Sequence, residues 1–110
     1  MIELREYIDE NGNRRFADWF GQLAAAAAAK VTIALARLEQ GNFSQVKGVG
    51  AGVFEYKIDF GPGYRIYFGK EGERLVILIG GGSKKRQQHD IEIAQECWAS
   101  YKRRKRRETQ

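Results

Sequence analysis

The sequence predicts a single α+β domain in which helices cover an antiparallel sheet. The 110 residues fit one domain of ordinary size, and 43% hydrophobic with 30% charged residues is the balance of a globular chain. Apolar residues recur with helical spacing in the first half of the chain and with a period of two in the second half. The expected order of elements is β-α-α-β-β-β-α.

The first expected elements are short. Residues 2–8 alternate roughly between apolar and polar side chains, which predicts a strand, and the turn-forming residues 10–13 close it. Residues 14–20 predict a short helix. Its inner face is expected to carry three aromatic residues, Phe16, Trp19 and Phe20.

A longer helix is expected from about residue 22 to residue 40, where Gly41 provides a stop signal. The alanine run at 24–29 favours the helix and carries no chemistry of its own. Apolar residues three and four positions apart would form the buried face, namely Leu23, Ala27, Val31, Ala34, Leu35 and Leu38.

Residues 53–60 and 64–68 alternate with a period of two and predict a hairpin. Directly paired residues share a face, so only a loop with an odd number of residues keeps both apolar sets on the core side. A three-residue loop at 61–63 satisfies this condition and would place Asp59 opposite Arg65. The face away from the core would then be a polar surface that carries Glu55, Lys57, Asp59, Arg65 and Tyr67.

The uninterrupted apolar run at 75–79 predicts a strand that is covered on both faces. Three glycines at 80–82 are expected to end this strand and to deliver the basic residues that follow. A last helix should begin at about Gln87. Its buried stripe would contain Ile91, Ala94, Trp98 and Tyr101.

Composition excludes several kinds of protein. One cysteine, Cys97, allows no internal disulfide, and one histidine, His89, leaves too few ligands for a Cys/His zinc site. No serine lies in a G-x-S-x-G motif. The glycine-rich stretches at 48–52 and 80–84 match neither the dinucleotide-binding pattern G-x-G-x-x-G nor the G-K-[ST] end of a phosphate-binding loop. No window is apolar enough to span a membrane, and the N-terminus does not resemble a signal peptide. We therefore expect a cytoplasmic protein with no cofactor, no metal and no membrane partner.

The positive charge is concentrated near the C-terminus. The net charge is +5, whereas residues 84–107 alone carry nine Lys or Arg against three acidic residues, a net of +6. Residues 102–107 are all basic, which favours binding to nucleic acid, although a frayed, solvated tail has the same composition. We divide the chain into a domain at 1–101 and a basic tail at 102–110.

A second group of cations is expected on the sheet. Lys57 and Arg65 lie on neighbouring predicted strands, and Lys84, Lys85 and Arg86 follow the last one. Arginine forks onto phosphate oxygens and lysine supplies a mobile positive charge, so this group suits a phosphodiester. The alternative is a solvated sheet face on which Asp59 and Arg65 form an ordinary cross-strand ion pair.

Two segments carry a resemblance to a known family. Residues 55–68, EYKIDFGPGYRIYF, and residues 81–91, GGSKKRQQHDI, resemble the RelE/ParE toxin superfamily. Together with Phe16-x-x-Trp19 and residues 37–43 they are similar to its HigB-like branch, the phage-associated addiction module killer proteins. The resemblance covers roughly residues 1–100.

This resemblance implies a RelE-like fold and a toxin that cleaves mRNA on the ribosome and is neutralised by a helix-turn-helix antitoxin. Arg65 matches the sheet arginine that contacts the scissile phosphate, and Lys84 matches the basic residue after the last strand. Lys57 stands where relatives more often have arginine, while Tyr67 and Lys85 are neighbours of these positions. The charges expected to bind nucleic acid outside the catalytic group are Arg86, Lys102, Arg103, Arg104, Lys105, Arg106 and Arg107.

Two other functions stay open at this point. A ParE-type toxin would share the scaffold and inhibit gyrase without cleaving RNA, although such proteins commonly lack the basic group on the sheet. A nucleic-acid-binding module that uses only the basic tail would have an inert sheet. The alanine run at 24–29 departs from the more charged segment that is common in relatives, and the basic tail has no counterpart in the family pattern.

Overall fold

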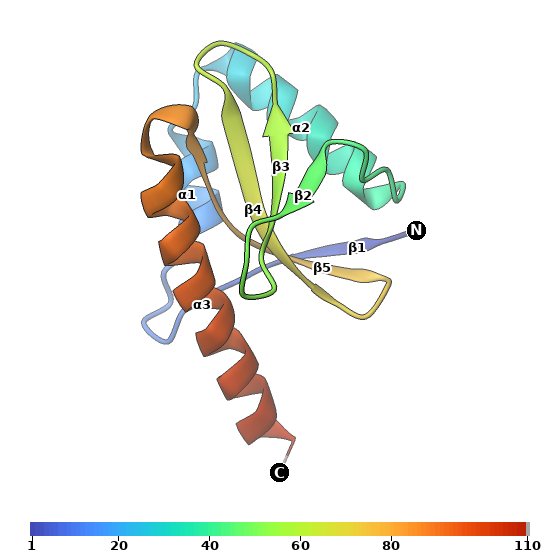
Figure 1. The fold of residues 1–110 in the computed structure, drawn as a ribbon, viewed down its shortest axis with the longest axis vertical. Helices are drawn as coiled ribbons and strands as arrows, with labels where there is room; N and C mark the ends of the chain where they lie inside the picture. The colour runs from blue at the N-terminus through green and yellow to red at the C-terminus, as the bar shows by residue number, and fades with distance from the viewer. Residues whose placement is uncertain (110) are drawn as a thin grey trace.

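The computed structural model describes residues 1–109, which form an α+β domain with one five-stranded sheet and three α-helices (Figure 1). The α+β class expected from the sequence is therefore confirmed. The elements in chain order are β1 (Glu3–Glu6), α1 (Arg15–Gly21), α2 (Ala25–Glu39), β2 (Val46–Gly48), β3 (Phe54–Ile58), β4 (Tyr64–Glu71), β5 (Leu75–Ser83), a 3₁₀ turn η1 (Lys84–Arg86) and α3 (Gln87–Glu108).

The sheet differs from the expected one in two ways. Its strand order is β1-β5-β4-β3-β2, and β1 runs parallel to β5, so the sheet is mixed and not purely antiparallel. The short strand β2, which the expected order lacks, pairs antiparallel with β3 at the far edge. Alternation along a strand identifies its buried face but not the direction of its partner, and three residues are too few to show a period.

The helices pack on opposite faces of this sheet. On one face, α1 and α2 bury Phe16, Val31 and Leu38 against Ile66 and Phe68. On the other face, α3 packs against the sheet. That second cluster contains Tyr67, Ile77, Ile79, Ile91, Ala94 and Trp98. Strand β5 is thus covered on both sides, as its apolar run predicts.

The three glycines of β5 do not end the strand, because pairing with β4 continues to Ser83. Helix side chains occupy the space that larger residues would need. A Cβ atom on Gly81 would collide with the ring of Trp19, and one on Gly82 would collide with the carboxylate of Asp90. Glycine within a strand here marks the close approach of two helices.

Helix α3 continues past the expected domain boundary at Tyr101, so residues 102–108 are helical and not a frayed tail. Figure 1 shows this helix running along the molecule to the C-terminus. Among residues 1–109, no helix has both the length and the apolar character needed to cross a membrane.

Candidate functional site

The hairpin formed by β3 and β4 has a longer loop than expected. Ile58 pairs with Tyr64 and Lys57 with Arg65, so the loop has five residues, 59–63, and the expected three-residue loop is wrong. The odd loop length and the assignment of faces were right. The amide of Gly63 donates to the carbonyl of Phe60 at 3.0 Å, and this local turn takes two more residues out of the ladder.

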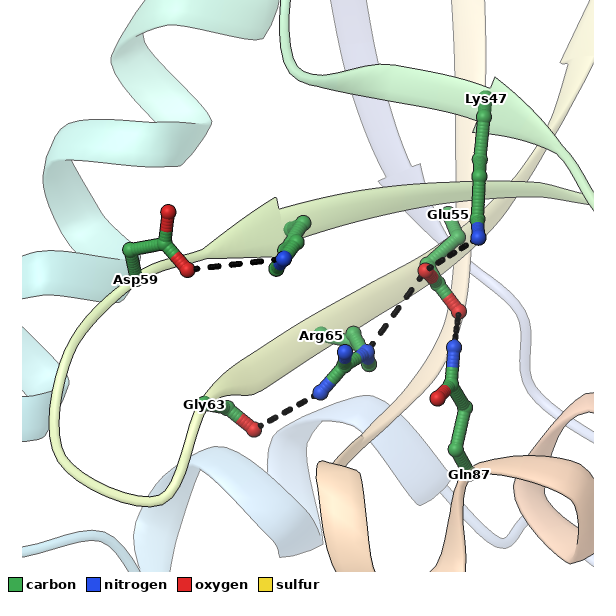
Figure 2. Close-up of polar contacts among 7 residues, drawn as sticks. Lys47, Glu55, Asp59, Gly63, Arg65 and Gln87 are labelled. Atoms are coloured by element: carbon green, nitrogen blue, oxygen red, sulfur yellow. Dashed lines mark hydrogen bonds and ion pairs between the residues drawn. The ribbon is translucent and has the colours of Figure 1, made fainter.

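The new register gives Arg65 a different partner from the one expected. Asp59 lies in the loop and pairs with Lys57 at 3.7 Å, so the expected Asp59–Arg65 ion pair does not form. Instead, Nε of Arg65 lies 3.6 Å from Oε1 of Glu55, which is on the neighbouring strand β3 (Figure 2). Nη1 of Arg65 also donates to the carbonyl of Gly63 at 3.1 Å. The guanidinium is therefore oriented by one hydrogen bond from Nη1 and by a longer ion pair at Nε, which donates no hydrogen bond to any of residues 1–109.

Glu55 is the centre of these contacts, and sequence reasoning did not assign it to the site. Only 1% of its surface is exposed, against 5% for Arg65. Gln87, at the start of α3, donates from Nε2 to Oε2 of Glu55 at 2.9 Å, and Nζ of Lys47 on β2 lies 4.0 Å from Oε1 (Figure 2). The expected polar surface is thus largely buried beneath α3. The sequence did contain a signal for this contact, because Glu55 and Arg65 lie on the same face of the predicted hairpin.

Three of the five predicted catalytic residues line one pocket. Lys57, Arg65 and Lys84 surround a pocket of about 380 Å³ with the loop at 59–63, and we call this the cationic pocket. The amide of Lys84 donates to the carbonyl of Gly63 at 2.9 Å, which fixes the start of η1 against the hairpin loop. Both lysines are exposed, whereas Arg65 is buried. Positive groups around a concave site make the pocket suitable for an oxyanion.

The other two predicted catalytic residues lie outside this pocket. Tyr67 faces α3 and lines a second pocket of about 440 Å³ between α1, β5 and α3, which we call the α1–α3 pocket. Arg86 lines the same pocket. Burial, and secondarily the charge of Glu55, raises the pKa of Tyr67 above its ordinary value, so its hydroxyl stays protonated. Lys85 is exposed on η1 and lines neither pocket.

The basic residues of α3 divide into two kinds. Three of them contact the body of the protein. Arg104 donates to the carbonyl of Ile8 at 2.7 Å, Lys105 lies 3.6 Å from Glu71, and Arg107 lies 3.5 Å from Glu10. Lys102 lies over the ring of Trp98, 5.9 Å from its centroid. Within residues 1–109, the side chains of Arg103 and Arg106 make no hydrogen bond or ion pair.

The part of the chain that the structure describes contains no group of three or more His, Cys, Asp or Glu residues arranged to hold a metal ion. The chemistry that the cationic pocket supports directly is charge stabilisation by Arg65 together with proton transfer by exposed lysines.

No protein-family model matches this chain. A protein of Haemophilus influenzae described as uncharacterized is 42% identical to it over 80 residues, which is 72% of this chain and 81% of that protein. The chain belongs to the family of this Haemophilus protein. Because that description names no activity, the function must be inferred from the residues of the chain itself.

Proposed function

We propose that this chain is the toxin of a type II toxin–antitoxin system, a HigB-like member of the RelE/ParE superfamily that cleaves mRNA on the ribosome. The observation that carries the proposal is the cationic pocket. A buried arginine, Arg65, is fixed there by Glu55 and Gly63 and lies beside Lys57 and Lys84. The resemblance assigns Arg65 to the scissile phosphate, and it matches Lys84 and Lys57 to basic positions of the family's site.

The proposed reaction uses the RNA's own nucleophile. The 2′-oxygen attacks the adjacent phosphorus, the bond to the 5′-oxygen breaks, and the products are a 2′,3′-cyclic phosphate and a 5′-hydroxyl. Arg65 stabilises the charge that builds up on the non-bridging oxygens, because its orientation is set before the substrate arrives. A preorganised donor avoids the cost of reorienting during the reaction.

Two proton transfers complete this reaction, and the two lysines are placed to share them. One lysine takes the proton of the 2′-hydroxyl in the proposed reaction, and the other gives a proton to the leaving 5′-oxygen. Lys57 must first release Asp59, but both groups are exposed, so their 3.7 Å ion pair is weak. Tyr67 and Lys85 lie outside the cationic pocket, and we assign them no step in proton transfer.

In the proposed function, the ribosome holds the mRNA substrate in position. A site without a strong base gains from a substrate already held in the reactive geometry, where orientation can supply about 7 kcal/mol or more of the barrier. The exposed cations of α3 suit the phosphate backbone of the ribosome or its mRNA. A helix-turn-helix antitoxin would restrain this activity until the toxin is released.

The test is brief induction without antitoxin, followed by primer extension on translated and untranslated transcripts. Wild-type protein should arrest growth and cut only translated mRNA. Arg74→Gln is the matched control, since it removes one exposed arginine outside the pocket and should cut as wild type does. Intact transcripts together with trapped gyrase–DNA complexes would replace this proposal with a ParE-type function. Binding to RNA with neither effect would leave only a binding module.

A further inference from the structure

Gln87 connects the first turn of α3 to the polar face of the sheet. Its side chain is half-buried, and its amide nitrogen Nε2 donates to Oε2 of Glu55 at 2.9 Å. Within residues 1–109, this is the only hydrogen bond that the Glu55 carboxylate accepts, because Oε1 accepts none. A carboxylate that is 1% exposed depends on such a donor for its orientation, since bulk water cannot replace it.

The series of contacts continues from Glu55 to the arginine of the cationic pocket. Figure 2 shows Gln87, Glu55, Arg65 and Gly63 joined by polar contacts in that order. Nε of Arg65 faces Oε1 of Glu55 at 3.6 Å without forming a hydrogen bond, so their attraction depends on where the carboxylate is held. A carboxylate that was free to rotate would no longer fix this end of the guanidinium. Gln87 is therefore placed to orient Arg65 through Glu55.

The start of α3 also holds the turn that carries Lys84. At the first residue of η1, the amide of Lys84 donates to the carbonyl of Gly63 at 2.9 Å, and the same carbonyl accepts from Nη1 of Arg65 at 3.1 Å. Gln87 follows η1 directly and bonds to the sheet at Glu55. The three-residue turn is thus attached to the hairpin at both of its ends.

The next residue of α3 is also a glutamine and has none of these contacts. Gln88 is exposed, and its side chain makes no hydrogen bond within residues 1–109. The packing of α3 has its own support, because Ile91, Ala94 and Trp98 are buried against the sheet. The bond from Gln87 to a buried carboxylate therefore has a role apart from holding the helix in place.

We propose that Gln87 is a positioning residue, which holds the Glu55 carboxylate so that the guanidinium of Arg65 keeps one orientation in the cationic pocket. Gln87 does not line that pocket, so it acts through its neighbours and not on the substrate. The contribution of Gln87 to cleavage rests on the proposed function, whereas the ordering of Arg65 does not. Removing the amide donor should free the guanidinium without removing its charge.

The motion of the Arg65 side chain tests this ordering directly. Arg65 is the only buried arginine among residues 1–109, and its Nε–Hε signal in a ¹⁵N NMR spectrum is identified by its loss in Arg65→Lys. The order parameter of this bond should be about 0.8 or higher in wild type and should fall below about 0.6 in Gln87→Met. Methionine is similar in length to glutamine but donates no hydrogen bond. Gln88→Met is the matched control and should leave the order parameter unchanged.

Cleavage at saturating ribosome concentration shows whether the ordering serves the reaction. The single-turnover rate of Gln87→Met should fall by about tenfold or more, because a small misplacement of a catalytic group can cost about 100-fold. The ribosome concentration that gives half the maximal rate should stay as in wild type, because the charges of Lys57, Arg65 and Lys84 are all retained. A merely structural role would lower the stability of the fold and leave the rate of the folded protein unchanged.

The outcomes separate this proposal from the proposed function. An unchanged order parameter of Arg65 in Gln87→Met overturns the positioning role even if the protein cleaves mRNA. An unchanged cleavage rate, in a wild-type protein that cleaves, overturns the part of Gln87 in the reaction. A lowered order parameter without cleavage by wild type supports the positioning of Arg65, and only the proposed nuclease function fails. If Gln87→Met does not fold, Gln87→Asn replaces it, since its amide is one methylene shorter.

Discussion

Two cationic regions of this protein hold their charges in opposite ways. In the cationic pocket, Arg65 is 5% exposed and its guanidinium is fixed by Glu55 and Gly63. On the last turns of α3, Arg103 and Arg106 are exposed and free of partners within the described residues. A fixed charge can stabilise a transition state without moving, whereas a mobile exposed charge mainly attracts and retains a polyanion. In the proposed function, the sheet therefore carries the reaction and the helix carries the binding.

The largest expected effect comes from the buried pair. Replacing both members, Glu55→Gln with Arg65→Gln, removes the oriented charge while keeping two polar side chains of similar size. Cleavage of ribosome-bound mRNA should fall by at least about 100-fold, the typical loss when one transition-state donor is removed. The measurement is the initial cleavage rate beside wild type and Arg74→Gln. A double variant that cleaves at the wild-type rate would remove Arg65 from the reaction.

The same pair makes a prediction about stability. Arg65→Ala alone leaves the carboxylate of Glu55 buried with only Gln87 and the distant Lys47 as partners, which should cost about 3 kcal/mol of unfolding free energy. Adding Glu55→Gln should recover most of this loss. Urea denaturation of the two variants measures the difference. If both are equally stable, the ion pair between Arg65 and Glu55 does not hold the site.

A smaller effect is expected from exposed arginines, and α3 offers a matched pair of variants. Arg103→Gln with Arg106→Gln removes two unpartnered arginines, whereas Arg104→Gln with Arg107→Gln removes two that contact Ile8 and Glu10. The first variant should bind ribosomes or RNA more weakly, with the slope of log affinity against log salt reduced by about 1.5, because two phosphate contacts are lost.

The second variant should instead lower thermal stability slightly, because the exposed Arg107–Glu10 ion pair contributes at most about 1 kcal/mol and the hydrogen bond from Arg104 to Ile8 contributes about as much. Filter binding at several salt concentrations and thermal denaturation separate the two effects. Identical losses of affinity in both variants would mean that only the net charge of the helix matters, and not which of its faces is free.

The smallest expected effect concerns the contact that joins the last turns of α3 to the sheet. Burial and a hydrogen bond of 3.0 Å to Glu71 raise the pKa of Tyr101 to about 12. An unfolded tyrosine titrates near pH 10, so this contact stabilises the fold fully below about pH 10 and loses its effect as the pH rises toward 12. Urea denaturation should show wild type more stable than Tyr101→Phe at pH 8, with the difference shrinking between pH 10 and pH 12. A constant difference over that range would contradict the assignment.

Much of the fold follows from periodicity in the sequence. The helices, the hairpin faces and the doubly covered strand β5 were all predicted from the spacing of apolar residues. The register of the hairpin was not, because loops of three and five residues give the same faces and differ only in local turn hydrogen bonds. The glycines of β5 were misinterpreted because their neighbours, Trp19 and Asp90, come from distant parts of the chain.

The candidate site was also predicted only in part, because some of its contacts join distant parts of the chain. Spacing put Lys57, Arg65 and Lys84 near one another, and they do line one pocket. It did not reveal that α3 covers this face, so Arg65 was expected to be exposed and Glu55 was left out. The packing of a helix on a particular sheet face depends on contacts between residues about 30 positions apart, such as Gln87 with Glu55, which no local pattern records.

Single-turnover cleavage of mRNA at saturating ribosome concentration tests the division between sheet and helix most directly, because saturation removes differences in binding. Arg103→Gln with Arg106→Gln should then cleave at the wild-type rate, while Glu55→Gln with Arg65→Gln should remain at least about 100-fold slower. If the helix variant is as slow at saturation as the pocket variant, the cations of α3 take part in the reaction and the division of roles is wrong.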